Sequence, residues 1–170
     1  MSKIHIIGSV GSGKTTFARK LSKRLNLPFY EIDNFVWDRS GKKDVRYPEE
    51  MRNHQFYEVI AKDEWIIEGA QHIWTGEGFK RADQILMLYP HLWVRNYRIL
   101  RRFVRQKIGL EQLNYKQTFP HLMKLYKWNY QFENQTKDEL LELFEPYKEK
   151  LVIIRNNWEL NCYFYAKCKR

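Results

Sequence analysis

The chain contains little cysteine and no long apolar run. Its two cysteines, Cys162 and Cys168, do not form a CxxC pattern and have no histidine at metal-ligand spacing. This argues against a disulfide framework or a structural metal site, and we expect two reduced thiols. No apolar run approaches the roughly 20 residues of a membrane-spanning helix, and the N-terminus has no secretory signal. We therefore expect a soluble cytoplasmic protein with no membrane association.

Acidic residues are almost missing from one quarter of the chain. Residues 91–132 contain nine Lys and Arg residues and a single Glu, whereas residues 1–90 contain 14 basic and 12 acidic residues. Most of the net charge of +10 therefore comes from the segment 91–132. Such a concentration of positive charge predicts an anionic partner. A nucleotide, a phosphorylated metabolite and a nucleic acid are the three alternatives.

Short apolar runs alternate with helical patterns along the chain. Five runs have the form of buried parallel strands: KIHII at 3–7, LPFYEI at 27–32, EWIIEG at 64–69, DQILMLYP at 83–90 and KLVII at 150–154. Helices are expected over 14–25, over about 47–61 and over 91–146, with breaks near Gly109 and Pro120. The alternation predicts an α/β fold, in which a five-stranded parallel sheet has helices on both faces, in one domain spanning 1–170.

The segment GSVGSGKTT, residues 8–16, matches the GxxxxGK(S/T) pattern of a P-loop and lies between the first strand and the first helix. In this motif backbone N–H groups converge on phosphate oxygens at a helix N-terminus. We expect Lys14 to reach the β- and γ-phosphates and the Thr15 hydroxyl to bind Mg²⁺. A glycine-rich turn that only caps a helix would leave the lysine and threonines unexplained. The predicted ATP-binding residues are Gly8, Gly11, Ser12, Gly13, Lys14, Thr15 and Thr16.

Acidic residues end the second and third predicted strands. Asp33 follows the second strand, where its carboxylate could orient an acceptor hydroxyl, although Asp33 or Asn34 could instead cap a helical turn. Glu68 ends the third strand in the manner of a magnesium-side carboxylate, although it could also be an exposed loop acid. Ligands of such folds bind beyond the carboxyl ends of the strands, which favours the functional interpretation of Asp33 and Glu68.

Four arginines follow the fourth predicted strand at helical spacing. Arg95, Arg98, Arg102 and Arg105 fall in one narrow arc of a helix. Guanidinium groups in such a row can clamp transferring phosphates, whereas the alternative is a solvated basic face. We expect the apolar residues to take the opposite, core-facing side: Leu92, Trp93, Ile99, Leu100, Phe103 and Val104.

The basic segment 91–132 also permits a different function, namely nucleic-acid binding with ATP as an effector. Its aromatic residues could stack on bases while its basic residues contact the backbone. Core-like spacing with Leu and Met favours instead an aromatic core face. A GTPase switch is not favoured, because the chain has no NKxD element. The aromatic residues are Tyr97, Phe103, Tyr115, Tyr126, Trp128 and Tyr130.

Taken in order, these motifs resemble the adenylate-kinase-like branch of P-loop kinases. The matching segments are GSVGSGKTT, YEID, WIIEG, ADQILMLYP and the arginine-rich helix. Over nearly all 170 residues the chain is most similar to the bacterial DNA topology modulation proteins, which are also called FlaR-related. The resemblance implies a three-layer P-loop NTPase fold with a five-stranded parallel core, ATP with Mg²⁺ as cofactors, and a helical lid over about 91–132.

The same resemblance implies roles for single residues. Asp33 matches the acceptor-side carboxylate, Glu68 the acid that helps Thr15 to hold magnesium, and Arg98 and Arg102 fall in the lid-like stretch. With Lys14, these residues predict a kinase that transfers the γ-phosphoryl group of ATP to a small-molecule or nucleotide acceptor. Nucleoside monophosphate kinases generally have an arginine after the glycine at 69, where this chain has Ala70, so AMP is not favoured. The acceptor, the base specificity and the oligomeric state stay open.

Overall fold

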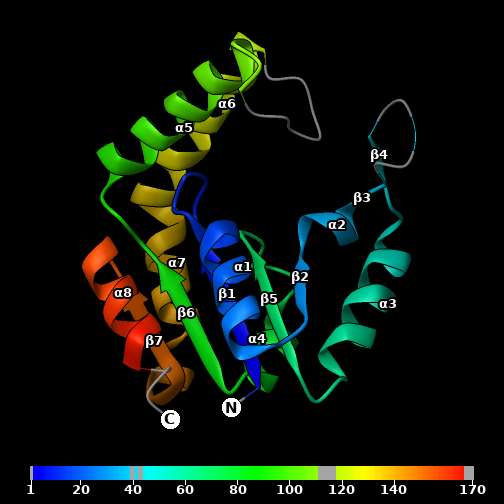
Figure 1. Ribbon diagram of the computed structural model, residues 1–170. Helices are drawn as coiled ribbons and strands as arrows, with labels where there is room; N and C mark the ends of the chain where they lie inside the picture. Colours follow the sequence, from blue (N-terminus) through cyan, green and yellow to red (C-terminus); the bar gives the residue numbers. More distant parts are fainter. Residues whose placement is uncertain (1, 39–40, 42–43, 111–117, 167–170) are drawn as a thin grey trace.

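Five strands form one parallel sheet, as the apolar runs predict. In the computed structural model, which describes residues 2–38, 41, 44–110 and 118–166, the strand order is β2-β5-β1-β6-β7 (Figure 1). Because β1 is central and all neighbours are parallel, the loop after β1 lies at the middle of the sheet's carboxyl edge. The strands are β1 (Lys3–Gly8), β2 (Phe29–Glu31), β5 (Trp65–Gly69), β6 (Gln84–Leu88) and β7 (Leu151–Ile154).

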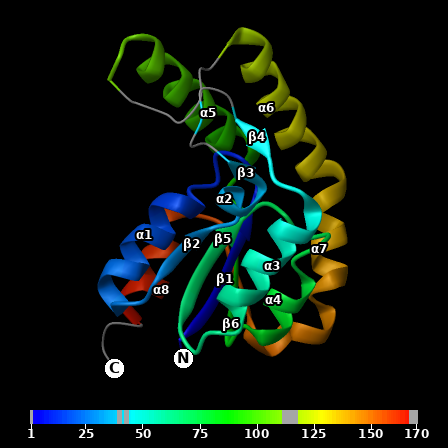
Figure 2. The same ribbon diagram turned by 90° about the vertical axis from the view of Figure 1, so that its right-hand side faces the viewer.

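Helices cover both faces of the sheet and make three layers. Helices α1 (Lys14–Leu25) and α8 (Asn157–Ala166) lie on one face, and α3 (Glu49–Ile60), α4 (Gly76–Arg81) and α7 (Lys137–Leu143) lie on the other (Figure 2). Alternate residues of β1 enter the two cores, because successive strand side chains point to opposite faces. Ile4 and Ile6 pack under α1, and Ile7 packs on the side of α3 and α4.

Two helices stand above the carboxyl edge. Helix α5 (Leu92–Lys107) leaves β6 and pairs with α6 (Phe119–Gln131), and Ile99, Leu122 and Leu125 form a small core between them (Figure 1). Gly109, with φ of 73°, follows the end of α5, which confirms the predicted break there. Pro120 lies in the first turn of α6 and so begins a helix. A π-helix (Phe132–Thr136) joins α6 to α7, and a 3₁₀-helix (Glu145–Lys150) precedes β7.

The expected orientation of α5 is wrong for part of its apolar residues. Trp93 is 75% exposed, and Leu100 and Val104 are also exposed, whereas Arg95 is fully buried. The reason is that α5 does not pack flat on the sheet. It crosses above the loop after β1, so that its arginine row faces the molecule and part of its apolar face is directed outward.

A small element after β2 was not predicted. Helix α2 (Asp33–Val36) is followed by a two-stranded antiparallel sheet of β3 (Trp37–Asp38) and β4 (Val45–Arg46). Strands of two residues are too short to show an alternating pattern in the sequence. Cys162 is exposed and unbridged, whereas Cys168 lies outside the described residues. The described residues include no helix with the length and apolarity of a membrane span, and the cytoplasmic location stays a prediction.

One ionisable side chain is enclosed in the core beside α4. His5 of β1 is fully buried and stacks on Phe79, with ring centroids 4.1 Å apart. Burial lowers the pKa of His5 to about 3, and a contact with the backbone of Gly78 only partly offsets this effect. The folded protein therefore holds His5 neutral, whereas an unfolded chain protonates histidine below a pKa of about 6.5.

Lowering the pH from 7 to 5 should destabilise the protein through His5. The unfolded state gains a proton in this range and the folded state does not, so this residue should reduce the free energy of unfolding by about 2 kcal/mol. Urea titrations of the wild type and His5→Leu at both pH values measure the effect as the difference between their pH dependences. The variant Ile66→Val, at a fully buried position of β5 without a titratable group, is the control and should keep the wild-type dependence. Equal pH dependence of His5→Leu and the wild type would contradict the buried neutral imidazole.

Candidate active site

The P-loop has the backbone conformation that its glycines predict. Gly11 and Gly13 have φ values of 75° and 95°, which side-chain-bearing residues rarely adopt. Gly13 immediately precedes α1, so the N-terminus of that helix opens into the loop. The loop thus has the geometry of an anion-binding nest at the positive end of a helix dipole.

Close backbone packing also explains two of the glycines. A Cβ atom at Gly8 would lie 2.4 Å from the carbonyl oxygen of Leu88, and one at Gly11 would lie 2.6 Å from that of Arg95. Both distances are too short for any side chain without movement of the backbone. The loop is therefore enclosed by β6 on one side and by α5 on the other.

The remaining P-loop residues predicted to bind ATP lie around this loop. Lys14 Nζ donates a hydrogen bond to the carbonyl of Ser9 at 3.2 Å, so the ammonium group lies across the nest. Ser12 is buried and donates its N–H to the same Ser9 carbonyl at 3.3 Å. Thr16 is exposed on the first turn of α1. The structure brings the lysine and the loop amides together, and their contacts with ATP stay a prediction.

Thr15 and Glu68 meet beside the loop, as expected for a magnesium-holding pair. Thr15 Oγ1 donates to Glu68 Oε1 at 2.7 Å. Glu68 is only 5% exposed within β5, so the alternative of an exposed loop acid is wrong. Burial raises the pKa of Glu68, whereas the Lys14 ammonium and the Thr15 hydrogen bond act in the opposite direction. The second carboxylate oxygen of Glu68 is buried and has no hydrogen-bond partner among the described residues.

These two side chains fit a magnesium ion. The unpartnered oxygen of Glu68 and the hydroxyl of Thr15 are hard oxygen donors, which is the ligand type that Mg²⁺ prefers. The described residues contain no group of three or more His, Cys, Asp or Glu side chains at metal-binding distance. That is compatible with Mg²⁺, because this ion usually keeps several waters and binds one or two protein groups together with phosphate oxygens.

Two further carboxylates lie at the same edge of the sheet. Glu31 is the register partner of Glu68 on the neighbouring strand, and Asp33 is the exposed first residue of α2. The charges of both contribute to raising the pKa of Glu68. Helix α2 has no side-chain cap, so the alternative in which Asp33 caps this turn is not observed. Glu31 was not predicted as a site residue, although it stands two residues before Asp33.

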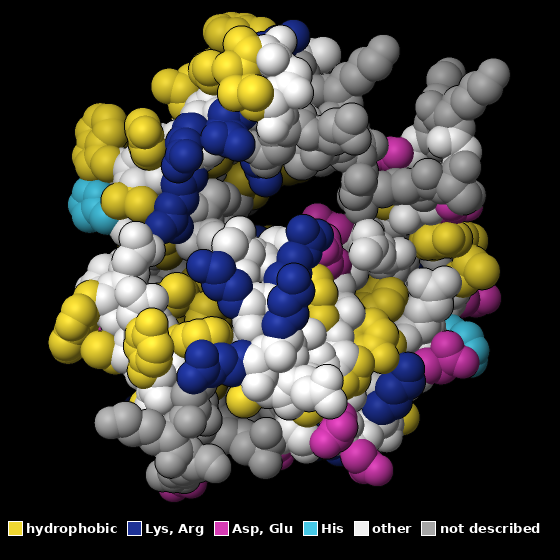
Figure 3. All heavy atoms as spheres, in the orientation of Figure 1, with side chains coloured by type: hydrophobic (Ala, Val, Ile, Leu, Met, Phe, Trp, Pro, Cys, Tyr) yellow, Lys and Arg dark blue, Asp and Glu magenta, His cyan; other side chains and the backbone are white. Residues whose placement is uncertain are grey.

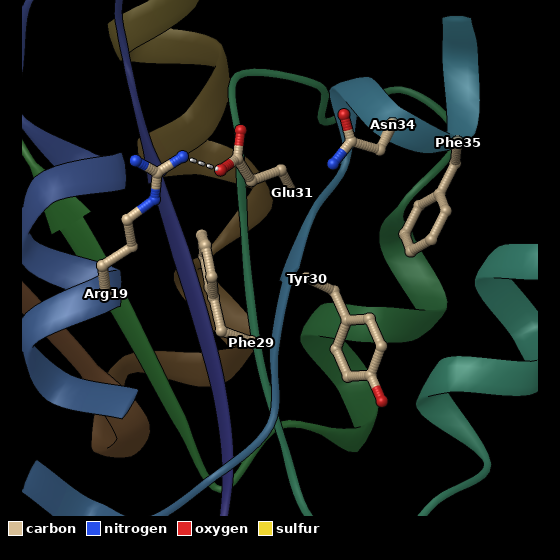
Figure 4. Close-up of a pocket in the computed structure, with 6 residues that line it drawn as sticks. All are labelled: Arg19, Phe29, Tyr30, Glu31, Asn34 and Phe35. Atoms are coloured by element: carbon tan, nitrogen blue, oxygen red, sulfur yellow. Dashed lines mark hydrogen bonds and ion pairs between the residues drawn. The ribbon is translucent and has the colours of Figure 1, made fainter. Parts of the chain in front are cut away.

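A cavity of about 350 Å³ lies beside these carboxylates (Figure 4). Arg19 of α1 reaches across it and forms an ion pair with Glu31 at 2.6 Å. Phe29 points toward the side of α1, whereas Tyr30 points toward α3 (Figure 4). The cavity therefore joins an ion pair to aromatic surface next to Asp33. Its lining residues are Arg19, Phe29, Tyr30, Glu31, Asn34 and Phe35.

The arginine row of α5 borders the P-loop, and its members differ in their environment. Arg95 Nη1 donates to Ser9 Oγ at 2.9 Å and to Asn129 Oδ1 at 2.8 Å, and Nη2 pairs with Glu133. Arg98 contacts the loop backbone, and Arg102, half-buried one turn further, has a buried Nε without a hydrogen-bond partner in the described structure. In the space-filling view, Lys and Arg side chains follow α5 and reappear below it over α1 (Figure 3). A merely solvated basic face does not describe this row.

A buried guanidinium on α3 was not predicted from the sequence. Arg52 is 6% exposed and lies 4.4 Å from the centre of the Trp74 ring. Its guanidinium donates to the side chain of Asn53, and the carboxylate of Glu49, 3.6 Å away, is largely exposed. A buried arginine whose carboxylate partner in the described structure is itself exposed is unusual. No motif in the sequence marked it, although it is the only Lys or Arg of α3.

Substituting Gly11 by alanine should destabilise the protein more than the same substitution at a glycine that has only a positive φ. Gly11→Ala adds a backbone clash to the positive-φ strain, and we expect it to lower the free energy of unfolding by at least about 2–3 kcal/mol. Gly109→Ala, where φ is 73° and the space is open, should cost about 1 kcal/mol. Denaturant unfolding measures these differences.

The control for this series is Gly76→Ala, where neither a clash nor a positive φ occurs. It should leave the stability nearly unchanged, because alanine favours the first turn of α4. If Gly11→Ala and Gly109→Ala cost the same, the close approach of Gly11 to the Arg95 carbonyl does not exist in solution.

Comparisons with known proteins agree with this geometry. A family model described as shikimate kinase matches residues 10–61, which run from the P-loop to the end of α3. The shikimate kinase of Clostridium beijerinckii is 25% identical over 170 residues, covering 94% of this chain and 99% of that protein. The uncharacterized protein YqaC of Bacillus subtilis is 30% identical over 115 residues, or 67% of this chain. The chain spans little more than half of YqaC, 56% of its length.

Solved structures show the same architecture. The shikimate kinase from Acinetobacter baumannii, solved in complex with shikimate, superposes with a TM-score of 0.51 and 19% identity over 92% of this chain and 84% of that chain. The enzyme from Bacteroides thetaiotaomicron gives a TM-score of 0.51 and 18% identity, with 94% and 91% covered. The chain has the fold of the P-loop kinases. The expected adenylate-kinase-like α/β architecture is therefore confirmed, and the matches support a phosphotransferase.

The relationship to the DNA topology modulation proteins stays a prediction. The names of the matching shikimate kinases and of YqaC do not refer to DNA. The roles of the single site residues and the extent of the lid also stay predictions.

Proposed function

We propose that the protein is an ATP-dependent kinase that transfers the γ-phosphoryl group to a hydroxyl of a small-molecule acceptor. The observation that carries this proposal is the Thr15–Glu68 hydrogen bond of 2.7 Å, which joins the P-loop to the end of β5. The neighbouring strand β2 leads into Asp33 at the same edge of the sheet. A nucleotide-binding loop alone would need no carboxylates at two further strand ends. We take 1–170 as one kinase domain in which 91–132 acts as the lid.

The P-loop residues form the donor half of the proposed site. The amides of Gly11 to Thr16 would cradle the phosphates, and Lys14 would turn from the Ser9 carbonyl toward the β- and γ-phosphates. Thr15 and Glu68 would hold Mg²⁺. When bound, the ion neutralises charge on the phosphate oxygens. Arg98 and Arg102 belong to the helix that borders this half of the site.

Asp33 would serve the acceptor half. Its exposed carboxylate can accept the proton of the acceptor hydroxyl while the oxygen of that hydroxyl forms a bond to the γ-phosphorus. The bond from the γ-phosphorus to the β–γ bridging oxygen breaks, and ADP leaves with that oxygen. Lys14 and the half-buried Arg102 supply positive charge to the transferring group.

The acceptor that fits best is a small hydroxylated carboxylate. Arg52 is a buried cation without a buried counter-charge, and it lies on α3, which packs next to α2, the helix of Asp33. The relatives named above as shikimate kinases act on such a molecule, since shikimate carries one carboxylate and three hydroxyls. Ala70, which cannot bind a phosphate as arginine does, makes AMP a poor candidate.

A direct assay tests the kinase proposal. With ATP and Mg²⁺, the protein should phosphorylate shikimate or a related hydroxy acid, detected as ADP release and as the product mass. Lys14→Met should lower kcat/KM by about 10²-fold or more, because it removes charge stabilisation of the transition state. Lys20→Met, at an exposed position on the same helix, should keep the wild-type activity.

Comparing the activity with the free acid and with its methyl ester tests the carboxylate-binding role of Arg52 separately from the kinase activity. Wild-type protein should prefer the free acid, and Arg52→Gln should remove that preference by raising KM for the acid only. Absence of Lys14-dependent product with a broad panel of hydroxylated acceptors would refute the kinase proposal. An unchanged preference in Arg52→Gln would refute only the carboxylate-binding role.

A nucleic-acid-binding function is the second candidate, because part of the aromatic set is not core. Tyr97 is 64% and Tyr130 65% exposed, and Trp128, also exposed, lies under the ammonium of Lys124. The favoured interpretation of these three as a core face is therefore wrong. Phe103 and Tyr126 are half-buried, and Tyr115 lies outside the described residues.

Salt titrations distinguish the two candidates. If this surface binds single-stranded nucleic acid, affinity should fall steeply between 50 and 200 mM salt by roughly tenfold or more, and Trp128→Ala should weaken it by about 1–3 kcal/mol. Trp158→Ala, an exposed tryptophan on α8, is the control and should leave it unchanged. Absence of binding, or binding that does not depend on salt, would exclude this candidate.

A further inference from the structure

Arg98 is bound to the backbone of the P-loop. Its Nη1 donates to the carbonyl of Ser12 at 2.8 Å and more weakly to that of Gly11 at 3.4 Å. Its Nη2 donates to Asn157 Oδ1 at 3.0 Å, at the start of α8. The guanidinium therefore bridges the loop and the turn after β7, two segments that are far apart in sequence.

The contact with the Ser12 carbonyl determines how the next amide is oriented. The carbonyl of Ser12 and the N–H of Gly13 belong to one planar trans peptide unit, in which the two groups point in opposite directions. Holding the carbonyl toward Arg98 therefore directs the Gly13 N–H away from the guanidinium. Charge-assisted hydrogen bonds such as this one are about twice as strong as neutral ones.

The surroundings leave the guanidinium little freedom. A Cβ atom at Gly13 would lie 3.2 Å from Arg98 Nη1, so the side chain packs against this residue of the loop. The P-loop is also held from α5 at Ser9, through the fully buried Arg95. Two arginines of one helix thus act on two positions of the same loop, one through a hydroxyl and one through a carbonyl.

We propose that Arg98 is a positioning residue that orients the Gly13 amide into the phosphate nest. The inference rests on the proposed function, since it concerns how that site binds its nucleotide. It differs from a clamp on the transferring phosphoryl group, the role that sequence analysis assigned to Arg98. Asn157 has a supporting role, because its side-chain oxygen holds the far side of the guanidinium.

The two roles predict different nucleotide selectivity. The P-loop amides cradle phosphates that ADP and ATP share, whereas a clamp on the γ-phosphate acts on ATP alone. Loss of a residue that orients Gly13 should weaken both nucleotides to the same extent. Loss of a γ-phosphate clamp should weaken only the triphosphate.

Calorimetric titration with Mg-ADP and with a non-hydrolysable Mg-ATP analogue tests this distinction. Arg98→Met should weaken both ligands by about 10-fold, leaving their affinity ratio unchanged. Arg98→Lys can still donate to the Ser12 carbonyl and should recover part of the loss, and Asn157→Ala should show a smaller loss with the same pattern. Arg101→Met, an exposed arginine of α5, is the matched control and should bind as the wild type does. Loss of affinity for the ATP analogue alone, or for neither ligand, would overturn the proposal.

A second measurement does not depend on nucleotide binding. The chain has eight glycines, so a glycine-labelled ¹⁵N spectrum is small enough to assign. In the nucleotide-free protein, Arg98→Met should shift the Gly13 amide and leave those of Gly76 and Gly109 in place, which also verifies that the variant folds. An unmoved Gly13 amide would overturn the proposal. If the wild type bound neither nucleotide, the kinase proposal would fail, and the Gly13 amide would still decide whether Arg98 orients the loop.

Discussion

The packing of the P-loop between β6 and α5 is the constraint on which the site depends. The backbone of Leu88 touches the loop at Gly8, and the backbone of Arg95 touches it at Gly11. A loop enclosed in this way keeps its amides oriented before a ligand arrives, and such preorganised dipoles need no rearrangement during a reaction. Helix α5 is therefore part of the proposed nucleotide site as well as part of the proposed lid. Because the backbone of α5 lies against Gly11, the arginine side chains of this helix can reach the loop as well.

Electrostatics divide the carboxyl edge of the sheet into two sides. Glu31, Asp33 and Glu68 gather negative charge at the ends of β2 and β5, whereas the arginine row of α5 borders the P-loop with positive charge. The Lys14 ammonium and the Arg19 guanidinium partly balance these carboxylates. Carboxylates placed close together repel one another, which costs free energy unless a bound cation or a proton neutralises part of their charge. The arrangement suits a magnesium–phosphate group between the two sides, with an acceptor at Asp33.

The fold was largely predictable because its signals are local. An apolar run followed by the P-loop and an amphipathic helix specified β1 and α1, and four more runs specified the other strands of the sheet. The β3–β4 pair was not predictable, since two residues carry no periodicity. The direction of α5 was not predictable either. A helix with one basic and one apolar face shows its period in the sequence, but the sequence does not state which face its neighbours cover.

By itself, the amino-acid sequence determined the parallel sheet, the P-loop and the placement of Asp33 and Glu68 at strand ends, because each follows from residues adjacent in the chain. Only the tertiary structure decided that Glu68 is buried against Thr15, that Arg95 is internal and that Arg98 holds the loop backbone. It also revealed Arg52 and Glu31. These features arise from contacts between different helices, strands and loops of the chain or from burial by other elements, and no local pattern encodes which distant groups meet when the chain folds.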